Sequence, residues 1–173
     1  RGFKTIVCPH NEANMDDSVC IQCGQCINAC PTAALQEKRH TDRVWQALND
    51  PKKSVVVQTA PSIRAAIGED YGMKPGRPCT GKTVSALRLL EFDAIFDTDF
   101  GADLTIMEEA NEFYHRLKNN ERLPIITTCS PGWINFMEKF YPYLIQNASS
   151  CMSPMTMLSS ITKSYYAKKI GID

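Results

Sequence analysis

The residues whose chemistry is clearest are four cysteines that lie within eleven residues, with a proline directly after the last. Their CxxCxxCxxxCP spacing is one that binds a four-iron, four-sulfur cluster through thiolates. The two-residue gaps let successive thiolates reach neighbouring irons, and Gly24 lets backbone amides approach the sulfides closely. The run therefore predicts a 4Fe-4S cluster, with the metal ligands Cys20, Cys23, Cys26 and Cys30.

The identity of the fourth ligand is open. In proteins with two such clusters, the fourth cysteine of a run binds the other cluster, so Cys30 could serve iron outside this run. Cys8 is followed by Pro9, and it could complete the cluster with the first three cysteines or remain a semi-buried free thiol. A structural zinc site is the alternative for the whole run, but zinc ligands usually come as separated CxxC pairs.

A second group of candidate residues lies at 127–133, where the sequence reads TTCSPGW. These residues follow a short apolar run that we expect to form a buried strand. In parallel α/β sheets, ligands gather beyond the carboxyl ends of the strands. The Cys129 thiol is therefore placed where such a sheet presents its chemistry, and residues 59–62 and 97–101 follow two other predicted strands in the same way.

Acidic and basic side chains recur on one face of the helix predicted at about 104–120. Glu109, Glu112 and Arg116 stand at positions i, i+3 and i+7, so they share that face. Such a stripe can pass protons inward. The alternative is a solvated surface face, on which Glu112 and Arg116 form an ordinary i,i+4 pair worth only ~0.2–0.5 kcal/mol.

The elements that must position these residues indicate an α/β fold, with parallel βα units preceded by a small ferredoxin-like iron-sulfur module. Residues 1–40 are poor in apolar periodicity, so we expect a module organised by its metal. Residues 41–52 form a connector that contains a short amphipathic helix. Residues 53–173 alternate apolar runs with helical patterns, which predicts parallel strands buried on both faces, at about 54–58, 94–98 and 123–128.

Composition excludes some classes of partner and location. Lys plus Arg and Asp plus Glu balance at 19 each, so no net charge favours a nucleic-acid partner. The apolar runs are far shorter than the ~20 residues of a membrane span, so none is predicted. The eight cysteines include a crowded group that suits metal rather than disulfides. Free thiolates need a reducing compartment, which predicts a cytoplasmic location.

Taken together, four segments resemble the iron-only (FeFe) hydrogenases in order and spacing over essentially the whole chain. They are TAPSIRA at 59–65, DTDFGADLTIMEEANE at 97–112, TTCSPGW at 127–133 and NASSCMSP at 147–154. The family's later signatures, which contain MPC and MACxxGC, do not occur here. The resemblance implies a central fragment, which consists of the end of a ferredoxin-type domain and the start of the domain that holds the catalytic H-cluster.

The resemblance implies reversible interconversion of protons and electrons with H2. The expected cofactors are 4Fe-4S clusters and, in the complete protein, an H-cluster that pairs a cubane with a di-iron unit bearing carbon monoxide, cyanide and a dithiolate. Electrons would come from ferredoxin or another redox subunit through the Cys20–Cys30 module. The remainder of the hydrogenase chain is a further expected partner, and we expect this chain alone to be inactive.

Residue roles follow from the same resemblance. Ala60, Pro61 and Ser62 match the segment that lines the di-iron unit, and Pro154 lies in another segment expected beside the cluster. The family's proton path runs from a cysteine through Glu, Ser, Glu and Arg to solvent. Its positions match Cys129, Glu109, Ser149, Glu112 and Arg116.

The sequence departs from the family pattern at two places. Ser130 stands where the family has a second cysteine that ligates the catalytic cubane, and Met155 replaces the glutamine expected after Pro154. A hydroxyl is a poorer iron ligand than a thiolate, so Cys151 is a candidate substitute. Either Cys129 remains the proton donor while Cys151 or Ser130 ligates iron, or Cys129 ligates and Cys151 donates the proton.

Two further classes of function compete with catalysis. The chain could belong to an electron-transfer module whose hydrogenase-like part is only a scaffold. It could also belong to an iron-sulfur carrier or a hydrogen-sensing protein without turnover. A sensory protein would be expected to lose the Cys129 thiol or its acidic partners, so the intact set of proton-path residues favours an enzyme.

Overall fold

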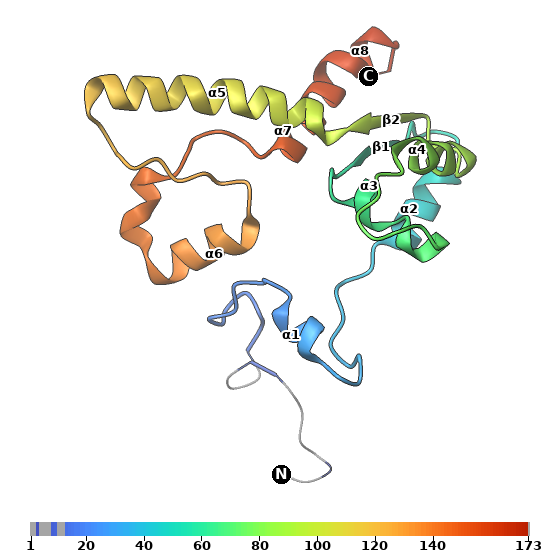
Figure 1. The fold of residues 1–173 in the computed structure, drawn as a ribbon, viewed down its shortest axis with the longest axis horizontal. Helices are drawn as coiled ribbons and strands as arrows, with labels where there is room; N and C mark the ends of the chain where they lie inside the picture. The colour runs from blue at the N-terminus through green and yellow to red at the C-terminus, as the bar shows by residue number, and fades with distance from the viewer. Residues whose placement is uncertain (1–2, 4–7, 10–12, 173) are drawn as a thin grey trace. The chain divides into compact units, whose positions relative to one another are not determined.

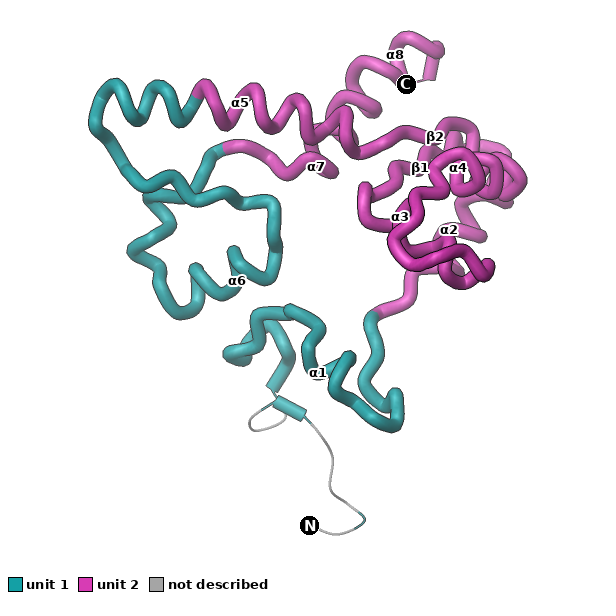
Figure 2. Tube along the Cα trace, viewed as in Figure 1, with its two compact units in different colours: residues 1–37, 112–150 teal, residues 38–111, 151–173 magenta. Residues whose placement is uncertain are grey.

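The computed structural model describes residue 3, residues 8–9 and residues 13–172. The chain divides into two compact units (Figure 2). Unit 1 comprises residues 1–37 and 112–150, and unit 2 comprises residues 38–111 and 151–173. Each unit combines two segments that are distant in the sequence. The expected domain boundaries near residues 40 and 52 stay a prediction.

Unit 2 contains a parallel two-stranded sheet, which confirms the α/β class and the parallel βα unit (Figure 1). Val56 pairs with Ala94 at one end of the register and Thr59 pairs with Asp97 at the other. The helical crossover that parallel strands require lies between them. The elements, in order, are β1 (Val56–Thr59), α3 (Ile63–Ala66), the 3-10 helix η3 (Glu69–Tyr71), α4 (Thr80–Leu89) and β2 (Ala94–Asp97).

The predicted third strand at about 123–128 is wrong. In the described residues this segment forms only an isolated parallel bridge, in which Ile126 pairs with Ala148. The Ile126 N–H donates to the Asn147 carbonyl at 2.9 Å, and the Ser149 N–H donates to the Ile126 carbonyl at 2.7 Å. The apolar segment therefore pairs with a neighbouring loop of unit 1 rather than with the sheet.

Burial of the strands also differs from the prediction. All four residues of β1 and all four of β2 are half-buried rather than buried on both faces. A two-stranded sheet has two edges, so each strand keeps one side without a paired neighbour. The apolar runs predicted strands that other elements cover on both faces. In the described part of the chain, these strands are covered only in part.

The predicted helical patterns form helices, although several are broken into shorter pieces. The longest, α5 (Thr98–Asn119), begins directly after β2, so residues 98–101 belong to a helix rather than to a loop. It starts in unit 2 and ends in unit 1. The remaining elements are α1 (Gln25–Ala29), α2 (Thr41–Leu48), α6 (Pro131–Phe140), the 3-10 helix η4 (Pro142–Asn147), α7 (Pro154–Ile161), the π-helix η5 (Thr162–Tyr166) and α8 (Ala167–Lys169).

The C-terminal helices of unit 2 are attached to the sheet by polar contacts. Gln58 of β1 donates through Nε2 to the Met155 carbonyl at 3.1 Å and to Ser159 Oγ at 2.9 Å. Its Oε1 accepts from Thr98 Oγ1 at 3.2 Å. Phe96 of β2 also makes an edge-to-face contact with Tyr166 of η5. Together these contacts hold α7 and η5 to the sheet.

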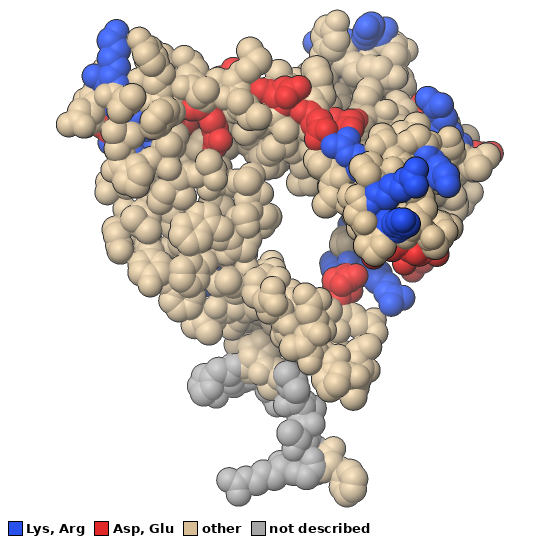
Figure 3. Space-filling view, viewed as in Figure 1, with Lys and Arg blue, Asp and Glu red and all other residues tan. Residues whose placement is uncertain are grey.

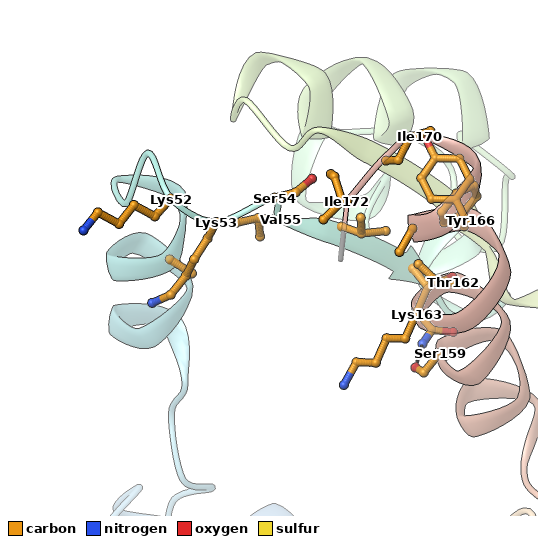
Figure 4. Close-up of a pocket in the computed structure, with 15 residues that line it drawn as sticks. Lys52, Lys53, Ser54, Val55, Ser159, Thr162, Lys163, Tyr166, Ile170 and Ile172 are labelled. Atoms are coloured by element: carbon orange, nitrogen blue, oxygen red, sulfur yellow. Dashed lines mark hydrogen bonds between the residues drawn. The ribbon is translucent and has the colours of Figure 1, made fainter.

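Between these helices and the sheet lies a pocket of about 620 Å³. Lys53 and Lys163 approach it from opposite sides, and Tyr166 forms part of its wall (Figure 4). Residues of the predicted catalytic and cluster-binding set do not line this pocket. It is a feature of the sheet and helix packing, separate from the candidate site.

Close packing fixes the start of α5 against the segment before α7. A Cβ on Gly101 would lie 2.2 Å from the Pro154 carbonyl oxygen, so only glycine fits there without displacement of the backbone. One turn later, Thr105 Oγ1 contacts the Gly101 carbonyl at 3.0 Å and the Met152 carbonyl at 3.4 Å. Residues 152–154 therefore lie against the first turns of α5.

Charged side chains are unevenly spread over the visible face (Figure 3). They gather over the α3 and α4 part of unit 2 and along α5, whereas uncharged side chains cover most of the surface over α6. Among the described residues, no helix is both long and apolar enough to cross a membrane.

Candidate functional site

The predicted cluster ligands lie in unit 1, on the short helix α1, directly after it, and on the loop before it, which turns sharply twice. Gln22 and Gly24 have positive φ angles of 56° and 76°, and α1 begins directly after Gly24. The Gln22 N–H donates to Cys20 Sγ at 3.3 Å. Backbone N–H groups aimed at ligand sulfur, with Cys23 and Cys26 exposed, are what an iron-sulfur cluster needs from its binding loop.

Cys30 follows α1, and its environment favours the thiolate form. Hydrogen bonding from the Leu35 backbone, then from the Thr32 side chain and backbone, lowers the pKa of the Cys30 thiol from 9.0 to about 7. Its Sγ lies 3.6 Å from Thr32 Oγ1. Because the thiolate is the form that binds iron, Cys30 fits the donor set of the predicted run.

The predicted ligands do not form a site for a single metal ion. Among residues 13–172 and the other described positions, no three His, Cys, Asp or Glu side chains stand close enough to hold one. A cubane is larger than an ion, and each thiolate binds a different iron, so its four sulfurs stand farther apart than the ligands of one ion. Cys8 is exposed.

The first turn of α6 packs against the loop that carries the cysteines. A Cβ on Gly132 would lie 3.8 Å from the Cα and Cβ of Cys23, at ordinary contact distance. One turn further along, Asn135 Nδ2 donates to the Ile21 carbonyl at 3.2 Å. The helix that begins within the TTCSPGW segment thus lies beside the loop of the predicted cluster site.

Cys129 and Ser130 stand at the start of this same helix. Cys129 is exposed, and Ser130 occupies the N-cap with Pro131 as the first helical residue. The Ser130 side chain makes no capping hydrogen bond. By contrast, the related Ser153 before Pro154 accepts from the Thr156 N–H at the start of α7.

The carboxylate of Glu112 is the centre of a polar cluster in unit 1. Its Oε2 accepts from Ser149 Oγ at 3.2 Å, from the Ser150 N–H at 3.1 Å and from Ser150 Oγ at 3.1 Å. Its Oε1 accepts from Arg116 Nη2 at 2.5 Å. Every donor comes from α5 or from the segment that follows η4, so the carboxylate joins these two parts of unit 1.

This arrangement changes the acidity of Glu112. Burial by itself raises the pKa, but hydrogen bonds from the Ser150 backbone, the Arg116 guanidinium and the Ser150 hydroxyl lower it more, and the net pKa is lowered. The carboxylate is therefore held ionised at neutral pH, as a strong hydrogen-bond acceptor.

Arg116 is buried, with only 3% of its surface exposed. Besides Glu112, its guanidinium donates to the carbonyls of Ala148 at 2.7 Å, Asn147 at 3.0 Å and Arg122 at 3.2 Å. Within the described residues its Nε has no acceptor. The solvated-face alternative for Glu112 and Arg116 is therefore wrong, because this ion pair is enclosed and tied to three backbone carbonyls.

Of the five expected proton-path residues, the structure brings together Ser149, Glu112 and Arg116. Glu109 is half-buried and lies three residues earlier in α5. Cys151 is also half-buried. Glu109 and Cys151 belong to unit 2, whereas Cys129 belongs to unit 1.

The expected di-iron segment forms the turn after β1. Ala60, Pro61 and Ser62 are exposed, and α3 begins directly afterwards. Arg64 of α3 bridges to Asp97 Oδ2 at 2.6 Å and to Asp99 Oδ2 at 2.5 Å. These two ion pairs connect α3 to the end of β2 and to the start of α5, and the pKa of Arg64 is raised, chiefly by the hydrogen bond to Asp99.

Sequence reasoning missed several of the residues that build these sites. Ser150 contributes twice to the Glu112 cluster, and its only signal was the neighbouring Ser149. Asn147 is buried and donates through Nδ2 to the Pro124 carbonyl at 2.9 Å. Its signal was its place in the NASSCMSP segment. Arg64 and Asn135 act through contacts with residues distant in sequence, which no local pattern shows.

Comparison with known proteins gives consistent matches for both parts of the chain. Residues 53–172 match the family described as iron only hydrogenase large subunit, C-terminal domain. Residues 13–36 match the 4Fe-4S binding domain family.

Two curated relatives are about half identical to this chain. Subunit HndD of the NADP-reducing hydrogenase of Solidesulfovibrio fructosivorans is 50% identical over 178 residues, which cover 99% of this chain and 30% of that protein. Iron hydrogenase 1 of Clostridium pasteurianum is 51% identical over 170 residues, which cover 98% of this chain and 30% of that protein. The chain thus spans under a third of the length of these relatives.

A solved structure has the same fold as most of the chain. It is a variant of the apo FeFe-hydrogenase HydA1 from Chlamydomonas reinhardtii, with a TM-score of 0.72 and 46% sequence identity. The match covers 78% of this chain and 35% of that one.

Proposed function

Because this chain belongs to the iron-only hydrogenase family, we propose that it is part of an enzyme that interconverts protons and electrons with H2. It carries a 4Fe-4S binding domain and part of the domain that binds the H-cluster. The H-cluster, when bound, supplies the hydrogen chemistry. This chain's own residues hold the electron-relay cluster, line one side of the catalytic site and handle protons.

The observation that carries this proposal is the contact between α6 and the cysteine loop, which comprises residues 16–30. Asn135 of α6 donates to the Ile21 carbonyl at 3.2 Å. A Cβ on Gly132, two residues after Ser130, would lie at van der Waals distance from Cys23. Ser130 stands where the family has a ligand of the catalytic cubane. A cluster bound at Cys20, Cys23, Cys26 and Cys30 would therefore lie beside the segment that faces the catalytic cluster, which supports a short route for electrons.

Glu112 and Ser149 suit a proton relay. The Ser149 hydroxyl donates to Oε2 of Glu112, so it can pass its proton to that carboxylate while it accepts another at its own oxygen. Glu109, earlier in α5, is the proposed step between Cys129 and Ser149. Since guanidinium groups do not deprotonate in proteins, Arg116 positions the Glu112 carboxylate rather than carrying the proton itself.

Ser130 and Cys151 decide how the catalytic cubane is held. The Ser130 hydroxyl is not used to cap α6, which is compatible with a ligand role. Cys151 follows Ser150 directly and is half-buried. In the favoured arrangement Cys129 is the proton donor and Cys151 or Ser130 ligates iron. In the other, Cys129 ligates and Cys151 donates the proton.

Partners and location are part of the same proposal. The remainder of the hydrogenase chain completes the H-cluster domain, and ferredoxin or another redox subunit supplies electrons. Among the described residues no cysteine forms a disulfide. Thiols that must bind iron persist best in a reducing compartment, which supports a cytoplasmic location.

The test compares two variants of the complete, matured hydrogenase that contains this chain. Cys23→Ala removes a proposed ligand of the relay cluster, and Gln25→Ala changes an exposed residue two positions away. We expect Cys23→Ala to lose most hydrogen evolution driven by a protein electron donor, while the infrared bands of the di-iron unit stay. Gln25→Ala should behave like the unaltered protein.

Two results would contradict the proposal. A matured protein that holds iron-sulfur clusters but neither evolves nor consumes H2 would make the chain part of an electron-transfer or sensory protein. Full hydrogen evolution by Cys23→Ala with the protein donor would remove the relay role of the cysteine loop.

A further inference from the structure

Lys139, near the end of α6, binds the main chain of the cysteine loop. Its Nζ donates to the carbonyls of Ser18 at 2.6 Å, Cys20 at 2.8 Å and Asp16 at 3.2 Å. An ammonium group has three donors and no acceptor. All three donors are thus used by alternate residues of one segment, about 120 positions away in the sequence.

Lys139 lies on the face of α6 that contacts the cysteine loop. Gly132, Asn135 and Lys139 stand at i, i+3 and i+7, so they share a side of the helix. A Cβ on Gly132 would lie 3.8 Å from Cys23, so this turn of the helix lies close to the loop. Asn135 donates to the Ile21 carbonyl, and Lys139 donates to the three carbonyls that precede Ile21 in the loop. Residues 16–23 are therefore held through their backbone by a single helix.

The loop has little apolar packing of its own. Met15 is 47% exposed and Val19 is 76% exposed, so burial contributes little to its order. Among the described residues its other polar contacts are local, such as Asn14 Nδ2 to Asp17 Oδ2 and Ser18 Oγ to the Met15 carbonyl. The backbone contacts from α6 therefore supply long-range restraints on the segment that carries Cys20.

The ammonium also places a positive charge beside a predicted cluster ligand. Reduction adds one electron from an external donor to the cluster, with no bond formed or broken, so the cluster becomes more negative by one charge. A nearby cation stabilises that state more than the oxidised state. The carboxylates of Asp16 and Asp17 on the same loop oppose this effect, and water screens it because Lys139 is exposed.

We propose that Lys139 is a positioning residue of the electron-relay cluster, which fixes the Cys20 end of the ligand loop against α6 and raises the cluster's reduction potential. The inference rests on the proposed function only in that a 4Fe-4S cluster is bound at this loop. It does not depend on hydrogen turnover.

The experiment uses the complete hydrogenase, purified without oxygen, and follows the paramagnetic signal of the reduced relay cluster during a redox titration. Lys139→Met keeps much of the side-chain bulk but removes the charge and the donors, whereas Lys139→Arg keeps both. We expect a more negative potential in Lys139→Met, by an amount that shrinks at high salt, and a potential near the unaltered value in Lys139→Arg. Lys118→Met, at an exposed lysine near the end of α5, is the matched control and should show no shift.

Hydrogen exchange of residues 16–22 in the same proteins tests the positioning part. Faster exchange or iron loss in Lys139→Met, with both restored in Lys139→Arg, supports it. An unchanged potential together with unchanged exchange in Lys139→Met overturns the proposal. Because the readouts are the cluster signal and backbone exchange, a protein without hydrogen turnover but with the expected shift would contradict the hydrogenase assignment and leave this inference standing.

Discussion

Ser150 donates twice to the carboxylate of Glu112, through its backbone N–H at 3.1 Å and through its hydroxyl at 3.1 Å. Both bonds favour the ionised carboxylate, and both lower the pKa of Glu112. The residue next to the expected relay serine therefore contributes, together with Arg116, to the lowered pKa of Glu112.

Ser150→Ala should weaken this control, because it removes the hydroxyl and keeps the backbone N–H. The pKa of Glu112 should rise, so the acidic limb of the pH dependence of hydrogen evolution should move to higher pH in the complete protein. Ser160→Ala, at an exposed position on α7, is the control. Identical pH profiles for Ser150→Ala and the unaltered protein would show that the hydroxyl does not tune the carboxylate.

The lowered pKa of Glu112 also predicts how stability depends on pH. A carboxyl whose pKa is lowered by folding stabilises the protein above the unfolded pKa of about 4.3, and that stabilisation is lost as pH falls through the folded value. Glu112→Gln should therefore lower the local unfolding free energy by about 1.5–3 kcal/mol at neutral pH, the range for hydrogen bonds to charged groups. The deficit should shrink in acid. Hydrogen exchange of residues 147–150 measures it, with Glu121→Gln at an exposed site as the control.

Glu109→Gln tests the proposed step nearest the thiol. The change keeps the side-chain size but removes the titratable group, so turnover of the matured protein should fall by about two or more powers of ten, in line with acid-base catalysis. The cluster spectra should stay the same. Glu108→Gln, at the exposed neighbouring position, should retain normal turnover. If Glu109→Gln also turns over normally, Glu109 is a structural carboxylate.

The fourth ligand of the relay cluster can be decided by iron content. The anaerobically reconstituted protein should hold about four irons at the cysteine run and give a paramagnetic signal on reduction. We expect Cys30→Ala to lose this signal and Cys8→Ala to keep it, since the Cys30 thiol is already poised as a thiolate with a pKa of about 7. The reverse result would assign the ligand to Cys8, and tightly bound zinc without a signal would exclude the cluster.

Cys151→Ala distinguishes the two arrangements at the catalytic cluster. If Cys151 ligates iron, the matured protein should lose H-cluster iron. If it donates the proton, iron should stay while turnover falls. Iron and infrared bands are measured on the same sample as turnover. Normal values for all of these would make Cys151 a small residue that only fills space.

The sequence determined the features that depend on local pattern. The cysteine spacing predicted the 4Fe-4S binding domain that the family comparison supports, and the alternation of apolar runs and helical patterns predicted β1, β2 and the helices around them. Both kinds of signal arise within a few residues, from ligand spacing or from side-chain periodicity.

Tertiary structure decided the features that depend on long-range contacts. The apolar run at 123–126 has the composition of a buried strand, but Ile126 pairs with residues 147–149 instead of the sheet. Arg116 has the spacing of a surface ion-pair residue, yet it is buried and donates to the backbone carbonyls of the distant Asn147 and Ala148. Lys139 carries no motif at all, because the carbonyls that bind it are main-chain atoms, which are the same in every sequence and which only the fold brings into reach.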